Sequence, residues 1–140
     1  MRIIVLDDDP VRAESFGQNN PGFQLNAATS ARDAIRFLRD QRCDVVFLDH
    51  DLDDHRAPGI RSSGTGLEVA LWIAACGEDT RPLLTVVHST NALGSGEMMR
   101  VLAEAGCPCL YWPQAWTHHG LMERVRLLLS RFPADNDPSD

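Results

Sequence analysis

Two short apolar runs in this sequence end abruptly in acidic residues. Val45 to Leu48 has the length and β-branched content of a strand that is buried on both faces, and the polar stretch Asp49 to Asp51 follows it directly. Arg2 to Leu6 likewise runs into three consecutive aspartates, residues 7–9. Like charges at such density repel one another unless a cation offsets them. The two runs therefore predict neighbouring buried strands whose carboxyl ends share one site for a cation.

Strand-like runs alternate with helix-like patterns five times along the chain, which is typical of a parallel sheet with crossover helices. The predicted strands are Arg2–Leu6, Phe23–Ala27, Val45–Leu48, Leu83–Val87 and Cys109–Trp112. Four predicted helices begin after the capping residues Asp9, Ser30, Thr65 and Thr117, and a further helix runs from about Gly96 to Ala105. Right-handed crossovers favour an α/β fold of the flavodoxin-like (βα)5 type, a three-layer sandwich with strand order 2-1-3-4-5. In that order, strands 1 and 3 flank the crevice where ligands bind.

Length and composition are those of one globular domain. We predict a domain over residues 1–132 and a disordered acidic tail over residues 133–140. The formal net charge is −7, and about −4 without the three acids of the tail. This charge argues against duplex DNA as a partner. No stretch approaches the roughly 18 apolar residues of a membrane span, so we expect a cytoplasmic protein without a membrane partner and with four reduced cysteines.

The sequence resembles the receiver domains of response regulators over nearly its whole length, to about Phe132. Residues 3–10 are similar to the first receiver strand with its metal-binding acids, and residues 44–49 to the third strand with its phosphoacceptor. The resemblance implies that Asp7 and Asp8 help to hold Mg²⁺, that Asp49 is the acceptor, and that Ser89 is the hydroxyl residue after strand 4.

One essential receiver residue is missing. Receivers carry a lysine followed by proline after strand 5, whereas this chain has Trp112-Pro113 there and contains no lysine at all. An arginine can replace the charge but not the compact ammonium donor. The sequence therefore argues against ordinary phosphoryl switching at Asp49.

A second resemblance is more specific, because it includes two histidines. The stretches Asp49-His50-Asp51-Leu52, Thr65-Gly66-Leu67 and Val87-His88-Ser89-Thr90-Asn91, with Gly94 following, are similar to the group called cyclic-phosphate processing receivers. That resemblance implies hydrolysis or transesterification of cyclic phosphates, such as a cyclic nucleotide or the 2′,3′-cyclic phosphate end of an RNA.

Opening a cyclic phosphodiester needs a base, an acid and stabilisation of charge on the phosphoryl oxygens. We expect His50 and His88 to act as the acid–base pair, beside Asp49. We expect Asp7, Asp8, Asp49 and Asp51 to hold Mg²⁺ or Mn²⁺, with imidazole favouring Mn²⁺.

Further polar residues are candidates for binding the phosphate group of a small molecule or an RNA end. They are Ser89, Thr90 and Asn91 after strand 4, and Arg56 and Arg61 in the polar loop from Asp53 to Gly64. The glycines and Pro58 of this loop suggest a lid, but the sequence does not decide whether it is one. The sequence leaves open whether Ser89 or His88 faces the pocket, since one residue of register reverses them. A protein partner is expected at the face formed by strand 4 to helix 5.

Two other functions remain open from the sequence. One is a divergent receiver that is phosphorylated or metal-bound at Asp49, and the absent lysine argues against it. The other is a non-catalytic pseudo-receiver that binds a partner or small ligand. The histidines at two strand ends argue against that second alternative, because a pure binding module does not need them there.

Overall fold

The computed structural model describes residues 1–19, 21–52, 64–113, 115 and 120–131. The elements are β1 (Arg2–Leu6), α1 (Pro10–Asn19), β2 (Gln24–Ala28), α2 (Ala31–Asp40), β3 (Val45–Leu48), α3 (Gly66–Ala75), β4 (Leu84–Val87), α4 (Ala92–Glu104), β5 (Cys109–Tyr111) and α5 (Leu121–Leu129). The five strands form one parallel sheet in the order β2-β1-β3-β4-β5. The predicted fold class and strand order are confirmed.

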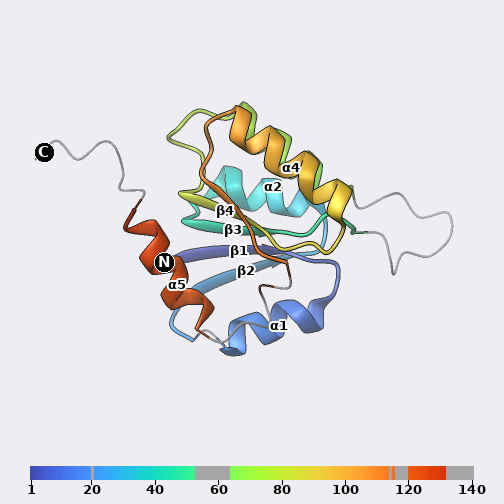
Figure 1. The fold of residues 1–140 in the computed structure, drawn as a ribbon. Helices are drawn as coiled ribbons and strands as arrows, with labels where there is room; N and C mark the ends of the chain where they lie inside the picture. The colour runs from blue at the N-terminus through green and yellow to red at the C-terminus, as the bar shows by residue number, and fades with distance from the viewer. Residues whose placement is uncertain (20, 53–63, 114, 116–119, 132–140) are drawn as a thin grey trace, which may run out of the picture.

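Helices cover both faces of the sheet and give three layers (Figure 1). On one face Leu38 of α2, Ile73 of α3 and Met98 of α4 pack against alternate strand residues. On the other face Phe16 of α1 and Val125 of α5 pack against the remaining strand residues. The central strands β1, β3 and β4 are buried on both sides, which explains their largely apolar sequences. As a result, polar side chains can gather only where the strands end.

Local capping decides where the helices begin. The Asp9 carboxylate accepts a hydrogen bond from the Val11 amide (2.9 Å), so that Pro10 is the first residue of α1. Ser30 caps α2 in the predicted way, by accepting from the Asp33 amide. Helix α4 begins at Ala92, earlier than the predicted Gly96, because the Asn91 side chain accepts from the Gly94 amide (3.0 Å). The strand-end residue Asn91 is therefore also a helix cap.

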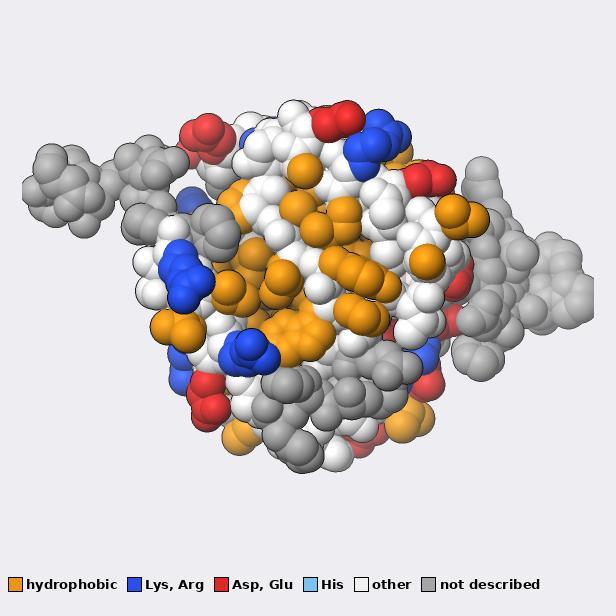
Figure 2. All heavy atoms as spheres, viewed as in Figure 1, with side chains coloured by type: hydrophobic (Ala, Val, Ile, Leu, Met, Phe, Trp, Pro, Cys, Tyr) orange, Lys and Arg blue, Asp and Glu red, His pale blue; other side chains and the backbone are white. Residues whose placement is uncertain are grey.

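The sheet edge at β5 carries an apolar surface. Figure 2 shows hydrophobic side chains gathered over the centre of this face. A cavity of about 370 Å³ lies here, lined by Tyr111, Trp112 and Leu127 among others, and the Arg124 guanidinium lies over the Trp112 ring at 5.4 Å. The protein partner expected at the strand 4 to helix 5 face stays a prediction.

The remaining structural expectations have different outcomes. All four cysteines are free thiols; Cys43 and Cys107 are buried, and Cys76 and Cys109 are partly exposed. None of the helices in the described part of the chain is both long and apolar enough to span a bilayer. Thr117, the predicted cap of the last helix, and the tail 133–140 lie outside the described residues.

Candidate functional site

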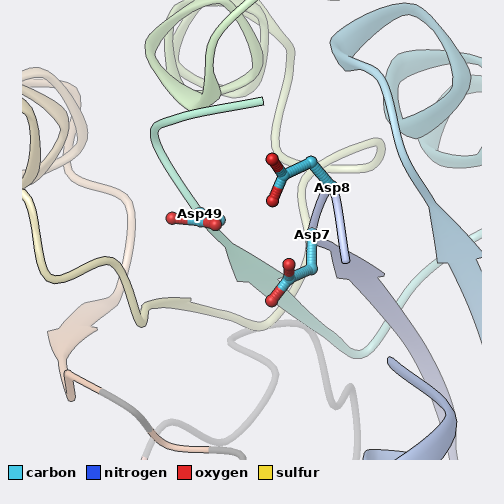
Figure 3. Close-up of side chains that lie close together, drawn as sticks. All are labelled: Asp7, Asp8 and Asp49. Atoms are coloured by element: carbon cyan, nitrogen blue, oxygen red, sulfur yellow. The ribbon is translucent and has the colours of Figure 1, made fainter. Parts of the chain in front are cut away.

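An acid cluster, made of Asp7, Asp8 and Asp49, lies at the carboxyl ends of β1 and β3 (Figure 3). Leu6 pairs in register with Leu48, so the residues that follow them enter the same space. The Asp49 amide completes the alignment by donating to the Leu6 carbonyl (3.1 Å). Each carboxylate offers one oxygen, and these oxygens lie within 4.8 Å of one another. The predicted cation site is thus brought together by the strand register.

Burial and crowding change the acidity of Asp49. Desolvation, followed by the negative charge of Asp7, raises the pKa of Asp49 to about 6. Hydrogen bonds from the His50 amide (2.8 Å) and the Ser89 side chain, together with the Arg12 charge, act in the opposite direction. Ionised Asp49 therefore destabilises the folded protein, and a bound cation would offset this destabilisation.

Ser89 faces this cluster, which resolves the register that the sequence left open. Its buried side chain hydrogen-bonds Asp49, and its hydroxyl oxygen accepts from the Asn91 amide (3.0 Å). Thr90, the next residue, is exposed. Of the three predicted phosphate-binding residues after β4, Ser89 and Asn91 thus lie in the crevice, tied to one another.

His88 points into the protein interior. Its side chain is 3% exposed, and its ring lies 6.5 Å from the Phe47 ring, in the layer of α1 and α5. Nε2 lies 3.2 Å from the Leu6 carbonyl oxygen, which can only accept, so Nε2 carries the proton. Burial lowers the pKa of His88, although the negative charge of Asp7 acts to raise it.

This burial argues against the expected acid–base role of His88. A residue that is 3% exposed offers little surface for contact with a substrate. The same Leu6 carbonyl accepts from both the His88 ring and the Asp49 amide, so His88 ties the ends of β1, β3 and β4 together. We therefore assign it a positioning role.

His50 lies on the opposite layer of the protein, against α4. Its Nδ1 is 2.8 Å from an Asp51 carboxylate oxygen, and the Asn91 amide nitrogen donates to that same oxygen (3.2 Å). Asn91 cannot turn its amide around, because its oxygen accepts from the Gly94 amide. We call His50, Asp51 and Asn91 the histidine triad. With Nδ1–H donated to Asp51, Nε2 is the nitrogen left for chemistry.

The triad changes the expected role of Asp51. Its carboxylate, 50% exposed, orients His50 and receives Asn91, and it does not belong to the acid cluster formed by the described residues. Asp51 also forms an isolated bridge with Thr65 at the start of α3. These contacts argue for an orienting role of Asp51 rather than the predicted metal-ligand role. Arg56 and Arg61 lie outside the described residues.

The sequence analysis missed Arg12. It follows the acidic triplet by one helical turn of α1, and its Nη2 lies 2.9 Å from Asp7, 3.3 Å from Asp8 and 3.9 Å from Asp49. Burial alone would lower the Arg12 pKa, but the hydrogen bond and attraction to Asp7 raise it overall. The capped start of α1 was the available signal, because it turns the first helical residues back toward the strand ends.

Comparison with known proteins identifies the family of the chain. Residues 2–104 match the family described as the cyclic-phosphate processing receiver domain. The chain belongs to this family. No curated protein matches the sequence.

Solved structures of receiver domains share the fold of this family member. A response regulator receiver domain from Methylobacillus flagellatus has a TM-score of 0.68 at 18% identity, covering 92% of this chain and 98% of its own. One from Methanospirillum hungatei JF-1 has a TM-score of 0.66 at 19% identity, covering 93% and 94%. The response regulator TrrA from Thermotoga maritima, solved in complex with Mg²⁺-BeF, has a TM-score of 0.62 at 23% identity, covering 91% and 97%.

The acid cluster has the donor chemistry of a site for a hard divalent cation. Its ligands within the described residues are carboxylate oxygens, which suit Mg²⁺ and Mn²⁺. The His50 ring is engaged with Asp51, so imidazole gives no preference for Mn²⁺ here. The residues present therefore fit an ion such as Mg²⁺.

Gly94 makes room for the histidine triad, which gives a first prediction. A Cβ atom at position 94 would collide with the His50 ring, whereas one at Gly96 in the same helix would meet nothing within 4 Å. Gly94→Ala should therefore lower the free energy of unfolding by about 1–3 kcal/mol and shift the His50 imidazole resonances. Gly96→Ala should be neutral or stabilising by up to about 1 kcal/mol. Equal effects in urea unfolding would contradict the packing of His50 on α4.

Asp49 gives a prediction about pH. Its folded pKa of about 6 lies above the ordinary 3.8, so the folded state binds the proton more tightly. Wild-type stability contributed by this group is present below pH 4 and is lost as the pH rises to 6. In EDTA, the free energy of unfolding of Asp49→Asn minus that of wild type should increase by about 1–3 kcal/mol between pH 4 and pH 6.5. If the free energies of unfolding of wild type and Asp49→Asn, measured by chemical denaturation, changed in parallel with pH, the carboxylate form of Asp49 would not destabilise the folded protein, and the prediction would be contradicted.

Proposed function

We propose that this protein is a metal-assisted phosphoesterase that processes cyclic phosphates, either cyclic nucleotides or 2′,3′-cyclic phosphate ends of RNA. The observation that carries the proposal is that two different chemical units lie side by side at the carboxyl ends of the strands. The acid cluster suits a divalent cation, and the histidine triad suits proton transfer. The units are linked, because Ser89 hydrogen-bonds Asp49 and accepts from Asn91, which contacts Asp51.

The acid cluster is the proposed electrostatic half of the site. Asp7, Asp8 and Asp49 would hold Mg²⁺ or Mn²⁺, which when bound stabilises negative charge on phosphoryl oxygens and makes a bound water more acidic. His88 supports the cluster indirectly, since it holds the Leu6 carbonyl that also receives the Asp49 amide.

His50 is the proposed proton-transfer residue. As water attacks, the new oxygen–phosphorus bond forms, the water releases one proton to solvent, and the phosphorus–oxygen bond to one ring oxygen breaks. An imidazolium whose Nδ1–H donates to Asp51 can pass its Nε2 proton to that departing alkoxide, leaving a neutral ring. Asp51 stabilises the charged ring and keeps its orientation, and Asn91 keeps Asp51 in place.

The phosphate group itself would be bound near the end of β4. The start of α4 at Ala92 presents the positive end of a helix dipole there, which favours an anion. Ser89 and Thr90 are the proposed hydroxyl donors, and Asn91 is the proposed link to His50. Arg56 and Arg61 remain proposed phosphate ligands on the basis of the sequence.

A turnover assay tests this proposal. Purified protein is incubated with 2′,3′-cyclic nucleotides and with RNA carrying a cyclic phosphate end, with Mg²⁺ or Mn²⁺ and with EDTA. We expect metal-dependent opening that falls about 10²- to 10⁴-fold in His50→Ala, and by a smaller factor in Asp51→Asn, which retains the shape of the side chain. Turnover that is unchanged in His50→Ala would exclude the proposed acid.

A receiver phosphorylated at Asp49 is the alternative function, and one observation favours it: Ser89 places a hydroxyl on Asp49 beside two further acids, as the receiver resemblance implies. The missing lysine argues against it. Incubation with acetyl phosphate and Mg²⁺, followed by intact mass, separates the two functions. A stoichiometric phosphoryl adduct that Asp49→Asn abolishes, without turnover of cyclic phosphates, would favour the alternative.

A further inference from the structure

The Arg12 guanidinium lies within the acid cluster. Its Nη2 atom is 2.9 Å from Asp7 Oδ1, 3.3 Å from Asp8 Oδ1 and 3.9 Å from Asp49 Oδ2. Its Nε also donates to Asp7 Oδ1 (3.1 Å). One nitrogen of Arg12 is therefore within ion-pair distance of all three carboxylates, and we propose that Arg12 is a tethered cation that competes with the divalent metal ion for the cluster.

The two cations cannot share these carboxylates. A divalent ion binds carboxylate oxygens at roughly 2.0–2.6 Å. An ion at that distance from these oxygens would overlap the position of the Arg12 Nη2 atom. It also needs the lone pairs to which Arg12 donates, and it repels the guanidinium as a like charge. Metal binding therefore requires the Arg12 side chain to leave.

The fold allows Arg12 to leave without loss of the core. Its side chain is 33% exposed, so the guanidinium borders solvent. Helix α1 is held by other residues, since Ala13 and Phe16 are buried against the sheet. Rotation of the Arg12 side chain about its own bonds is sufficient, and the backbone of α1 can stay in place.

The competing arginine also accounts for the stability of the metal-free state. Asp7 is 1% exposed and lies beside two further acids, an arrangement that needs a positive charge. The lysine that receivers carry after the fifth strand is absent from this chain. Arg12 of α1 supplies the positive charge instead. It does so only until a metal ion replaces it.

Metal affinity of an Arg12 variant tests the inference without an activity assay. Mn²⁺ is titrated into wild type, Arg12→Gln and Arg36→Gln, and free Mn²⁺ is measured by electron paramagnetic resonance. Arg12→Gln should bind Mn²⁺ about tenfold more tightly or better, because it retains a polar side chain but loses the competing charge. Arg36→Gln removes an equal charge from the surface, where Arg36 pairs with Asp33, and should bind as wild type does.

Unchanged or weaker Mn²⁺ binding by Arg12→Gln would overturn the inference. If that variant does not fold, the wild type provides the test by NMR: the Arg12 Nε–Hε resonance, assigned with Arg12→Lys, should move as Mg²⁺ is added. A resonance that stays in place at saturating Mg²⁺ would also overturn it.

The inference rests on the proposed function only in treating the acid cluster as the metal site. Its failure is therefore distinguishable from failure of the proposed chemistry. Tighter Mn²⁺ binding by Arg12→Gln, with no turnover of cyclic phosphates by any variant, would support the competition and refute the phosphoesterase.

Discussion

The parallel pairing of β1 with β3 is the constraint on which the site depends. Because Leu6 and Leu48 are in register and both strands are buried, Asp7 and Asp49 emerge side by side in a place that water reaches poorly. Desolvation, followed by the negative charge of Asp7, disfavours ionisation of Asp49 and raises its pKa. A positive charge must offset this, and Arg12 supplies it in the structure. The whole crevice is organised around that charge balance.

The two strand-end histidines differ because side chains alternate along a strand. Leu48 pairs with Val87, so Asp49 and His88 follow on the face of the sheet that carries Phe47. His50 is one residue further and reaches the other face, beside Gly94 of α4. The buried histidine thereby aligns the strand ends, and the histidine near the surface meets Asp51 and Asn91.

The sequence predicted the fold and much of the acid cluster for a physical reason. Buried parallel strands read as continuous apolar runs, and their polar ends mark one edge of the sheet. It could not assign His50 and His88, since both follow apolar strands and only the pairing register separates their faces. Nor could it assign Asp51, whose carboxylate is directed by Asn91 from a segment 40 residues away. Arg12 was overlooked because its role depends on how α1 leaves β1.

A crystal structure with Mn²⁺ and its anomalous scattering tests the charge-balance account most directly. The account predicts one ion bound by oxygens of Asp7, Asp8 and Asp49, with the Arg12 guanidinium moved out of the cluster and His50 still held by Asp51. An ion bound instead between His50 and Asp51, or an Arg12 side chain that still contacts Asp7 and Asp49 beside a bound ion, would contradict it.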